Sequence, residues 1–520
     1  MDPIAATLGI LALAVIAFLS NRVPLGAVAI GVAIALWATG VLDLVDALAG
    51  FGDPTVLFIA ALFVVSEALD ATGVTTWAAH QVIGRAGPSP RRLLIMIMLL
   101  VAALTALISV NGSVAALIPL VVVVAVRSGI APSRLLLPLA FAAHAGSMLA
   151  LTGTPVNIIV SEAANDAAGR PFGFFEFTIV GVPLVVGTLL IVMLFGNRLV
   201  PERVPSALAP DLSGHAQLLK KHYDLATGEV PLVGTANGVT EVLVAPRSSL
   251  IGTHVFPGMV SPSGDLVIVA ARRGGEILRG RSTTLEAGDQ LLLSGSWEDL
   301  RRHTSGPDVI VVDTPDELRR TVPLGRGARR TIIILAAMVI LLATGVVPPA
   351  VAALLAGLAV VLTRVLNVRE TYRAISWTTV VLVAGMIPLS TAFTSTGAAD
   401  LLADGLLRML GGAGPHLALL LICVITLILG QLISNTATVL IMIPVALALA
   451  ADLHVSALPF LMALTVTGAA ALFTPIATPA NMMIMEPAGY RFGDYWKLGL
   501  PLAVLYLAVS VLFVPLIWPF

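Results

Sequence analysis

The sequence has little charge and almost no cysteine, and each scarcity excludes a class of protein. Asp, Glu, Lys and Arg make up 11% of the 520 residues, whereas an ordinary soluble domain carries about 25%. The single cysteine, Cys423, excludes a disulfide framework and a cysteine metal cluster. The net charge of -1 argues against a nucleic-acid partner. The chain is therefore not an ordinary soluble globule.

Several catalytic and pore signatures are also missing from the sequence. It contains no His-Glu-x-x-His zinc motif, no phosphate-binding Gly-Lys-Ser/Thr loop and no Gly-x-Gly-x-x-Gly string. The Thr-Val-Gly-Tyr-Gly filter of potassium channels is absent as well. These absences argue against an enzyme and against a potassium channel, and we expect no organic cofactor.

Hydrophobic residues, by contrast, form 58% of the chain and gather in long runs free of charged side chains. Runs of about 20 apolar residues are typical of membrane-spanning helices. The first run, residues 4–20, lacks a basic leader and has a counterpart near residues 331–347, so we expect it to be retained as a span. The pattern predicts a polytopic α-helical membrane protein with about 10–11 transmembrane helices.

Two motifs occur twice in the same order, about 324 residues apart. Gly153-Thr154-Pro155-Val156-Asn157 corresponds to Ala477-Thr478-Pro479-Ala480-Asn481. Ser109-Val110-Asn111-Gly112-Ser113 corresponds to Ser434-Asn435-Thr436-Ala437-Thr438 at nearly the same offset. Such a duplication is typical of transporters in which two repeats enclose a substrate site. We therefore expect an internally duplicated transporter.

The charges between the apolar runs predict that the two repeats are inverted in the membrane. Acidic residues precede the run at 54–74, whereas arginines precede its partner at 378–397, and cytoplasmic loops are enriched in Lys and Arg. The stretch 93–126 is basic at both ends, and its partner 415–450 is flanked by acidic residues. Each stretch is too short for two full crossings, so we expect two re-entrant hairpins that enter from opposite faces.

Residues 204–328 are more polar and divide the chain into a first membrane half, residues 1–203, and a second, residues 329–520. Three strand-like stretches in this segment are separated by Gly, Ser and Pro: Val242–Val244, Leu266–Ala270 and Gln290–Leu293. A structureless loop of this length would be unusual. We therefore expect an inserted α/β domain, and the arginines on both sides of it predict a cytoplasmic location.

Both Thr-Pro motifs should interrupt a helix inside the membrane, which is tolerated only in a protein interior or beside a watery cavity. Proline frees a backbone carbonyl, which suits sodium. The helix that restarts after the break points its N–H groups into the gap, and these groups suit an anion. The hairpin tips add neutral hydroxyl and amide oxygens, which can coordinate a monovalent cation and donate to an anion. No Lys or Arg lies near either motif, so we expect a bound cation to be a condition for anion binding.

These residues resemble a known family. Ser434-Asn435-Thr436, followed by Pro444, and the Ala477–Asn481 string are similar to the Ser-Asn-Thr and Thr-Pro signatures of the divalent anion/sodium symporter (DASS) family. The resemblance covers residues 54–198 and 376–518. It implies two sodium sites at the tips and breaks, an anion between them, and a homodimer that works by an elevator mechanism.

The resemblance, together with the chemistry of the tips and breaks, assigns roles to individual residues. Sodium ligands are expected at Ser109, Asn111, Gly153, Asn157, Asn435, Thr438, Ala477 and Asn481. Anion contacts are expected at Asn111, Ser113, Thr154, Ser434, Asn435, Thr436, Thr478 and Pro479. The first tip departs from the family pattern, and two alignments stay open: one on Pro119 places Val110 opposite Asn435, and one shifted by a residue places Asn111 there.

The insert is similar to the regulator-of-potassium-conductance C-terminal (RCK_C) domain. The resemblance rests on Ser249–Gly252, Ala271–Glu276 and Leu285–Leu293 followed by Gly295. Such domains dimerise, and some bind small ligands, so the resemblance implies a homodimer with a regulatory ligand on the cytoplasmic side. A dimerisation module without a ligand is the alternative.

The leading hypothesis is a sodium-coupled symporter of a small divalent anion, such as sulfate or a dicarboxylate. We expect it in the plasma (cell inner) membrane, in contact with membrane lipid. The alternative is a proton-coupled antiporter or a metalloid or anion efflux transporter, in which Asp70 or Glu67 would titrate. We interpret Glu67 and Asp70 first as an interfacial pair, and His144 as a core histidine with satisfied hydrogen bonds.

Overall fold

A computed structural model of the chain contains two compact units. One unit holds residues 1–67, 82–208 and 333–520, and the other holds residues 68–81 and 209–332. The structure describes all residues except 1, 21, 87–88, 129, 204–236, 262–264, 275, 279–282, 305, 313–326, 399–400, 402–404 and 406–413. Both ends of the predicted insert, at 204–236 and 313–326, and Gly275 of its motif therefore lie outside the described residues.

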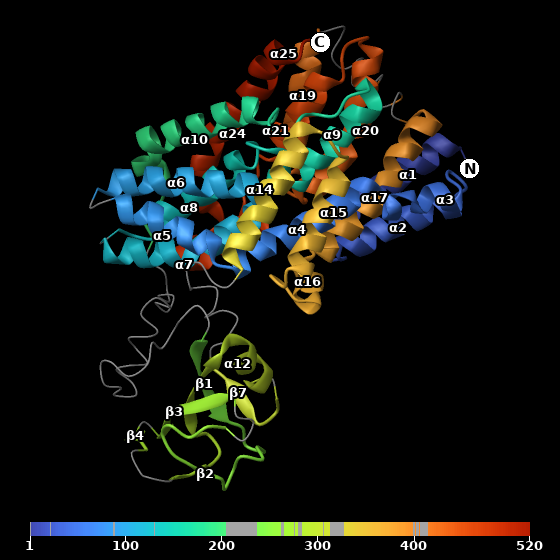
Figure 1. The fold of residues 1–520 in the computed structure, drawn as a ribbon. Coiled ribbons are helices and arrows are strands. Elements are labelled where there is room, and N and C mark those ends of the chain that lie inside the picture. The colour runs from blue at the N-terminus through green and yellow to red at the C-terminus, as the bar shows by residue number, and fades with distance from the viewer. Residues whose placement is uncertain are drawn as a thin grey trace. The chain divides into compact units, whose positions relative to one another are not determined.

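The first half of the chain consists of helices joined by short connections (Figure 1). They are α1 (Pro3–Ser20), α2 (Leu25–Ala38), α3 (Leu44–Leu48), α4 (Pro54–Ala71), α5 (Val74–Ala86), α6 (Pro90–Leu107), α7 (Val110–Arg127), α8 (Ser133–Gly146), α9 (Pro155–Ala168) and α10 (Thr178–Leu199). A 3-10 turn, η1 (Ala49–Gly52), follows α3, and another, η2 (Leu151–Gly153), precedes α9.

The second half repeats this order of elements. Its helices are α14 (Ala328–Thr344), α15 (Pro349–Leu362), α16 (Val368–Ala374), α17 (Trp377–Thr396), α19 (Pro415–Leu429), α20 (Asn435–Asp452), α21 (Leu458–Gly468), α22 (Pro479–Met483), α23 (Met485–Ala488), α24 (Tyr495–Ala508) and α25 (Val514–Ile517). Three shorter elements are η3 (Pro475–Ala477), η4 (Phe492–Asp494) and η5 (Val509–Phe513), of which η5 is a π-helical turn. Thus α14 to α17 correspond to α1 to α4, and α19 to α22 correspond to α6 to α9.

Six helices among the described residues are long and apolar enough to cross a membrane. They are Leu44–Ala71, Pro90–Leu107, Thr178–Leu199, Trp377–Thr396, Asn435–Asp452 and Phe492–Ile517. The prediction of a polytopic helical membrane protein is confirmed. The predicted number of about 10–11 spans is reached only if shorter apolar helices, such as α2 and α15, also cross.

Helix α17 of the second half packs against α1, α2 and α3 of the first half. The backbones touch there: a Cβ atom on Gly385 would lie 2.6 Å from the carbonyl oxygen of Ala29, and one on Gly50 would lie closer still to the carbonyl oxygen of Ala384. Only glycine fits at such distances. The two halves are therefore joined by close backbone packing at this contact.

The chain's last residues lie beside the start of α10. The indole Nε1 of Trp518 donates a hydrogen bond to the Glu176 carboxylate at 2.8 Å, two residues before α10 begins. The ring of Phe460, in the first turn of α21, packs edge-on against Phe520, with centroids 5.8 Å apart. Helix α21 therefore begins near the end of the membrane unit at which α10 begins.

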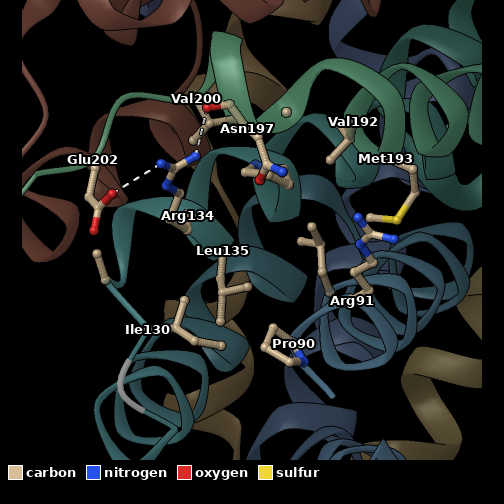
Figure 2. A pocket seen from close by; sticks show the side chains of 14 residues that line it. Pro90, Arg91, Ile130, Arg134, Leu135, Val192, Met193, Asn197, Val200 and Glu202 are labelled. Atoms are coloured by element: carbon tan, nitrogen blue, oxygen red, sulfur yellow. Dashed lines mark hydrogen bonds and ion pairs between the residues drawn. The ribbon is translucent and has the colours of Figure 1, made fainter.

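The opposite end of α10 lies beside the start of α8. The backbone N–H of Arg203 donates to the Ser133 hydroxyl at 2.9 Å, and the Arg134 guanidinium donates to Glu202 at 3.0 Å (Figure 2). Arg203 also forms an ion pair of 2.8 Å with Asp494. Helices α8 and α21, which occupy equivalent places in the two halves, thus start at opposite ends of α10.

The second unit contains a five-stranded antiparallel sheet in the order β4-β3-β6-β1-β7. Its elements are β1 (Asn237–Val244), β3 (Leu266–Arg273), β4 (Glu276–Ile277), β6 (Gln290–Ser296), β7 (Val309–Val311) and the helix α12 (Trp297–Thr304), and β2 (His254–Val255) pairs with β5 (Thr283–Thr284). The three predicted strand stretches lie in β1, β3 and β6. Alternate side chains such as Val242, Ile268 and Leu291 form its buried core.

Candidate functional site

Both halves contain a helix break at the Thr-Pro motif. One break separates α8 from α9, the other separates α21 from α22, and each contains a short 3-10 turn. Thr154 and Thr478 cap the restarting helices, because their hydroxyls accept the N–H groups of Val156 and Asn481 at 3.4 Å. The following prolines occupy the first helical position, where a missing N–H costs no hydrogen bond.

The motif asparagines hold the two breaks in the same way. The Asn157 amide nitrogen donates to the carbonyl oxygens of residues 147 and 150, both at 2.9 Å. The Asn481 amide nitrogen donates to the carbonyl oxygens of residues 471 and 474, at 2.8 and 3.1 Å. These carbonyls lie in the breaks, beyond the last residues of α8 and α21. Each asparagine therefore has a structural task, and only its side-chain oxygen is free for another contact.

Close backbone packing supports each break at an equivalent position. A Cβ atom on Gly181 would clash with the carbonyl group of Met148, its carbon lying only 2.6 Å away. A Cβ atom on Gly499 would meet the carbonyl carbon of Leu472 at 2.8 Å. Helices α10 and α24 thus approach the unwound segments so closely that both positions require glycine.

The hairpin tips also have matching hydrogen bonds. The Ser109 hydroxyl accepts the backbone N–H of Gly112 at 3.2 Å, and the Ser434 hydroxyl accepts the N–H of Ala437 at 3.3 Å. In both cases the serine precedes the helix and bonds the N–H three residues later, as an N-cap does. The two serines are therefore equivalent.

This equivalence resolves the alignment that the sequence leaves open. The alignment on Pro119 is the one that pairs the two capping serines. Val110 then occupies the place of Asn435, and Asn111 occupies the place of Thr436. The first tip therefore lacks the amide oxygen that Asn435 provides in the second.

Two side chains of the first half contact the break of the second half. The Asn111 side-chain oxygen accepts the backbone N–H of Ala480 at 3.2 Å. His144, on α8 and buried, has its Nε2 atom 3.1 Å from Asn481 Oδ1 and 3.4 Å from Thr478 Oγ1. The interpretation of His144 as a histidine with satisfied hydrogen bonds is confirmed, and its partners are two predicted ligand residues.

Sequence reasoning missed Gln431, a buried side chain between α19 and α20. Its Nε2 donates to the carbonyl oxygens of Leu427 and Ala470 at 3.1 and 2.7 Å. Its Oε1 accepts the N–H groups of Leu472 and Phe473 at 3.1 and 2.9 Å. The three bonds to Ala470, Leu472 and Phe473 fix the second hairpin to the second break. A glutamine within an apolar stretch was the signal in the sequence that could have identified it.

Four of the predicted ligand side chains have a buried oxygen without a hydrogen-bond partner in the described part of the chain. These oxygens are Ser113 Oγ, Asn157 Oδ1, Asn435 Oδ1 and Thr438 Oγ1. Ser113 and Thr438 are equivalent in the alignment on Pro119. An unpartnered buried oxygen is costly, so these four oxygens are available as ligands.

The other predicted residues also lie at the tips and breaks. Gly153 and Ala477 are buried in the 3-10 turns, Ser434 and Thr436 are partly exposed at the second tip, and Pro479 is exposed. Contacts join the first tip to the second break, since α7 packs on α22, and the second tip to the first break, since α20 packs on α9. The predicted site residues therefore fall into two crossed pairs of elements.

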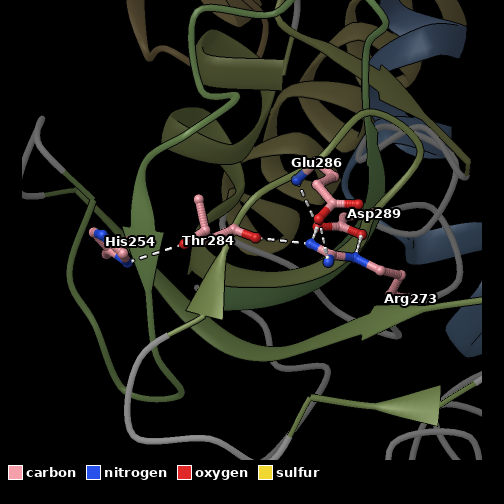
Figure 3. Close-up of polar contacts among 5 residues, drawn as sticks. All are labelled: His254, Arg273, Thr284, Glu286 and Asp289. Atoms are coloured by element: carbon pink, nitrogen blue, oxygen red, sulfur yellow. Dashed lines mark hydrogen bonds and ion pairs between the residues drawn. The ribbon is translucent and has the colours of Figure 1, made fainter.

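The motif residues of the second unit form a salt-bridge cluster (Figure 3). Arg273 on β3 donates to both oxygens of the buried Asp289 carboxylate at 2.7 Å, to Glu286 at 2.6 Å and to the Thr284 carbonyl at 2.7 Å. Burial favours protonation of Asp289, but the bonds from Arg273 and from the Glu286 N–H outweigh it and hold the pKa of Asp289 below its usual range. This part of the motif thus fixes a turn.

Comparison with known proteins places the chain in a family. A profile described as Citrate transporter (CitMHS) matches residues 15–467 and 397–520. The chain is 31% identical to the uncharacterized transporter YfbS of Escherichia coli (strain K12) over 99% of both chains. It is 27% identical to the uncharacterized transporter sll0640 of Synechocystis sp. over 99% of this chain and 97% of the relative.

A partial match is also informative. Sodium/sulfate cotransporter 1 of Chlamydomonas reinhardtii is 26% identical over 52% of this chain and 32% of its own length. The relatives and the family are transporters, in agreement with the expectation from the duplicated motifs. The chain belongs to the citrate transporter family of the ion transporter superfamily, a family of secondary transporters of citrate- and sulfate-type anions.

Proposed function

We propose that the chain is a sodium-coupled symporter of a small divalent anion that works by an elevator mechanism. The observation that carries this proposal is the set of four buried oxygens at the tips and the first break that lack partners among the described residues. All four belong to neutral hydroxyl or amide groups, which suit a monovalent cation and cannot by themselves balance an anion. A cation and an anion would therefore be bound together.

The donor set fits a cation best in the second half. Asn435 Oδ1 and Thr438 Oγ1 would hold it, together with the carbonyl group of Ala477 in the 3-10 turn of the second break, because Gln431 bonds the second hairpin to the segment before that turn. Bound sodium would supply the positive charge that the site's own residues lack. In the first half Ser113 and Asn157 offer one oxygen each, but Val110 stands where the second half has an amide. We infer that the first half binds a cation more weakly.

The anion would lie between the capped helices that restart after the breaks. Thr154 and Thr478 already accept N–H groups, so their hydroxyl protons can point to an anion. The name of the Chlamydomonas relative supports sulfate, and the family description supports a carboxylate such as citrate. Asn111 and His144, which hold the second break, would position the anion site from the first half.

We further propose that the two halves are inverted and that both tips are re-entrant. The starts of α8 and α21 at opposite ends of α10 support the inversion, because equivalent helices then run in opposite directions. The buried Cys423 is the chain's only cysteine. In a Cys423→Ser background, Ser109→Cys and Ser434→Cys should therefore react with an impermeant thiol reagent from opposite sides of the membrane. Labelling of both from one side would contradict the inversion.

The sheet unit between the halves is proposed as a cytoplasmic domain of RCK_C type that joins two copies of the chain in the plasma membrane. The antiparallel sheet with its single described helix and its own hydrophobic core supports an independently folded module. A small regulatory ligand on this unit is part of the same proposal. Cross-linking of the full-length protein in membranes would show whether it is a dimer.

The decisive experiment is uptake into proteoliposomes. Labelled sulfate, succinate and citrate would each be supplied with an inward gradient of sodium, of potassium or of protons. We expect uptake of at least one anion with sodium only. Uptake that is insensitive to sodium but driven by protons would contradict the proposal and favour proton coupling. The Asn435→Val variant should lose uptake if that uptake is driven by sodium, and should keep it if it is driven by protons.

A further inference from the structure

A cavity of about 280 Å³ lies between α6, α8 and α10, and no residue of either Thr-Pro motif lines it. The first turns of α6 and α8 and the last turn of α10 form its walls (Figure 2). The candidate spans Pro90–Leu107 and Thr178–Leu199 begin and end beside it. The cavity is therefore at the level where a membrane helix meets the lipid headgroups.

Two arginines lie on different sides of this cavity (Figure 2). Arg91 is exposed, and no carboxylate pairs with it among the residues that the structure describes. Arg134 donates to the carbonyl oxygen of Asn197 at 3.0 Å and to Glu202 at 3.0 Å. The Glu202 side chain is 65% exposed, so this ion pair is weak and an incoming anion can share the guanidinium. The polar part of the cavity is thus set up for an anion.

The rest of the wall is apolar. Leu94, Leu135 and Val192 line it, and the last two are almost completely buried. Inorganic phosphate or a similar free ion would contact the arginines but would leave the partly exposed Leu94 against water. The volume is below the roughly 300–1,000 Å³ that encloses a whole small molecule. The cavity therefore suits one charged group with the first carbon atoms of an attached chain.

We propose that this cavity binds the headgroup of an anionic phospholipid. Arg91 contacts the phosphate, Arg134 shares its guanidinium between Glu202 and the lipid, and Leu94 and Leu135 cover the first carbons of one acyl chain. Basic pockets between membrane helices bind anionic headgroups by the same chemistry. Helices α6 and α8 belong to the hairpin and the broken helix of the first half, so an occupied cavity also braces the elements that carry Asn111 and His144.

Thermal unfolding of the purified full-length protein in a neutral detergent tests the proposal. The detergent is supplemented with either dioleoylphosphatidylglycerol or dioleoylphosphatidylcholine, and the lipid concentration that gives half of the shift in the unfolding midpoint is measured. We expect stabilisation by phosphatidylglycerol only. The Arg91→Gln variant should need about fivefold more of it, because one arginine near a headgroup contributes about that factor.

Arg92→Gln is the matched control, since Arg92 is the exposed neighbour of Arg91 and does not line the cavity. It should respond as the wild type does. Equal stabilisation by the two lipids, or equal responses of the two variants, would overturn the proposal. Full stabilisation by inorganic phosphate or glycerol phosphate without lipid would also overturn it, because the site would then belong to a free anion.

Discussion

His144 offers the sharpest test of the proposal that the two halves share one site. Its Nε2 atom is 3.1 Å from the side-chain oxygen of Asn481, whose amide nitrogen holds the second break. Replacement by leucine keeps an apolar side chain of similar size in the space but removes the hydrogen bond. The Asn481 oxygen is then buried without a partner, which costs about 1–3 kcal/mol.

We expect this cost to appear in both stability and transport. The unfolding midpoint of the His144→Leu variant should fall by a few degrees, because a kcal/mol or two shifts a domain by that amount. Thr478 lies 3.4 Å from the same nitrogen, so the anion contacts of the second break should loosen as well. If the whole cost falls on anion binding, the KM for the transported anion rises about 5- to 150-fold.

The assay is proteoliposome uptake together with thermal unfolding, and His144→Gln is the informative companion. Its amide nitrogen can donate to the Asn481 oxygen, so we expect it to recover much of the KM and of the midpoint. If the glutamine variant is as impaired as the leucine variant, the shape of the imidazole ring matters and the hydrogen-bond argument is refuted. An unchanged KM in His144→Leu would refute it too.

Three further predictions follow from other parts of the chain. Asn435→Val should abolish sodium-dependent thermal stabilisation, whereas Val110→Asn should leave it intact or strengthen it; equal losses would contradict the inequality of the two tips. Asp289→Asn should destabilise the sheet by about 1–2 kcal/mol, measured as faster hydrogen exchange in β6, and Glu286→Gln by about 0.5 kcal/mol or less. Because the pKa of Asp289 is lowered in the folded protein, its contribution is present at neutral pH and is lost as the pH falls through that pKa. Thr188→Val should change the unfolding midpoint little, since the buried Thr188 hydroxyl has no partner in the described chain; a large drop would reveal a missing bond.

The sequence alone was sufficient for the helical membrane class, for the two breaks and for three strands of the sheet. Each of these depends on local patterns, such as long apolar runs or a threonine before a proline, that have one structural solution. It was not sufficient for the roles of Asn157 and Asn481. An amide side chain offers a donor and an acceptor, and only the folded backbone shows that the donor is used up by carbonyls of the preceding turn.

The sequence could not decide between the two tip alignments for a different reason. Either Ser109 can be aligned with Ser434, or Asn111 can be aligned with Asn435 after a shift of one residue. The sequence alone gives no reason to prefer one alignment. The helix N-cap does, because in both tips the capping serine accepts the N–H three residues later. Gln431 was missed because its four partners are backbone groups, which leave no mark in the sequence.

The differences between the halves lie around the second break. Asn435 there corresponds to Val110 in the first half, and Gln431 ties the second hairpin to its break with three bonds. His144 gives the Asn481 side-chain oxygen a hydrogen-bond partner. The equivalent residue in α21 is Gly468, where a Cβ atom would lie 2.5 Å from Val439, so the Asn157 oxygen has no such partner. A duplicated unit begins with two equal sites, so in the proposed transporter these substitutions would make the second site the more rigid one and leave the first less constrained. Since a pre-organised site loses less entropy when it binds, the second break should bind the cation more tightly and the first break should be the one that moves.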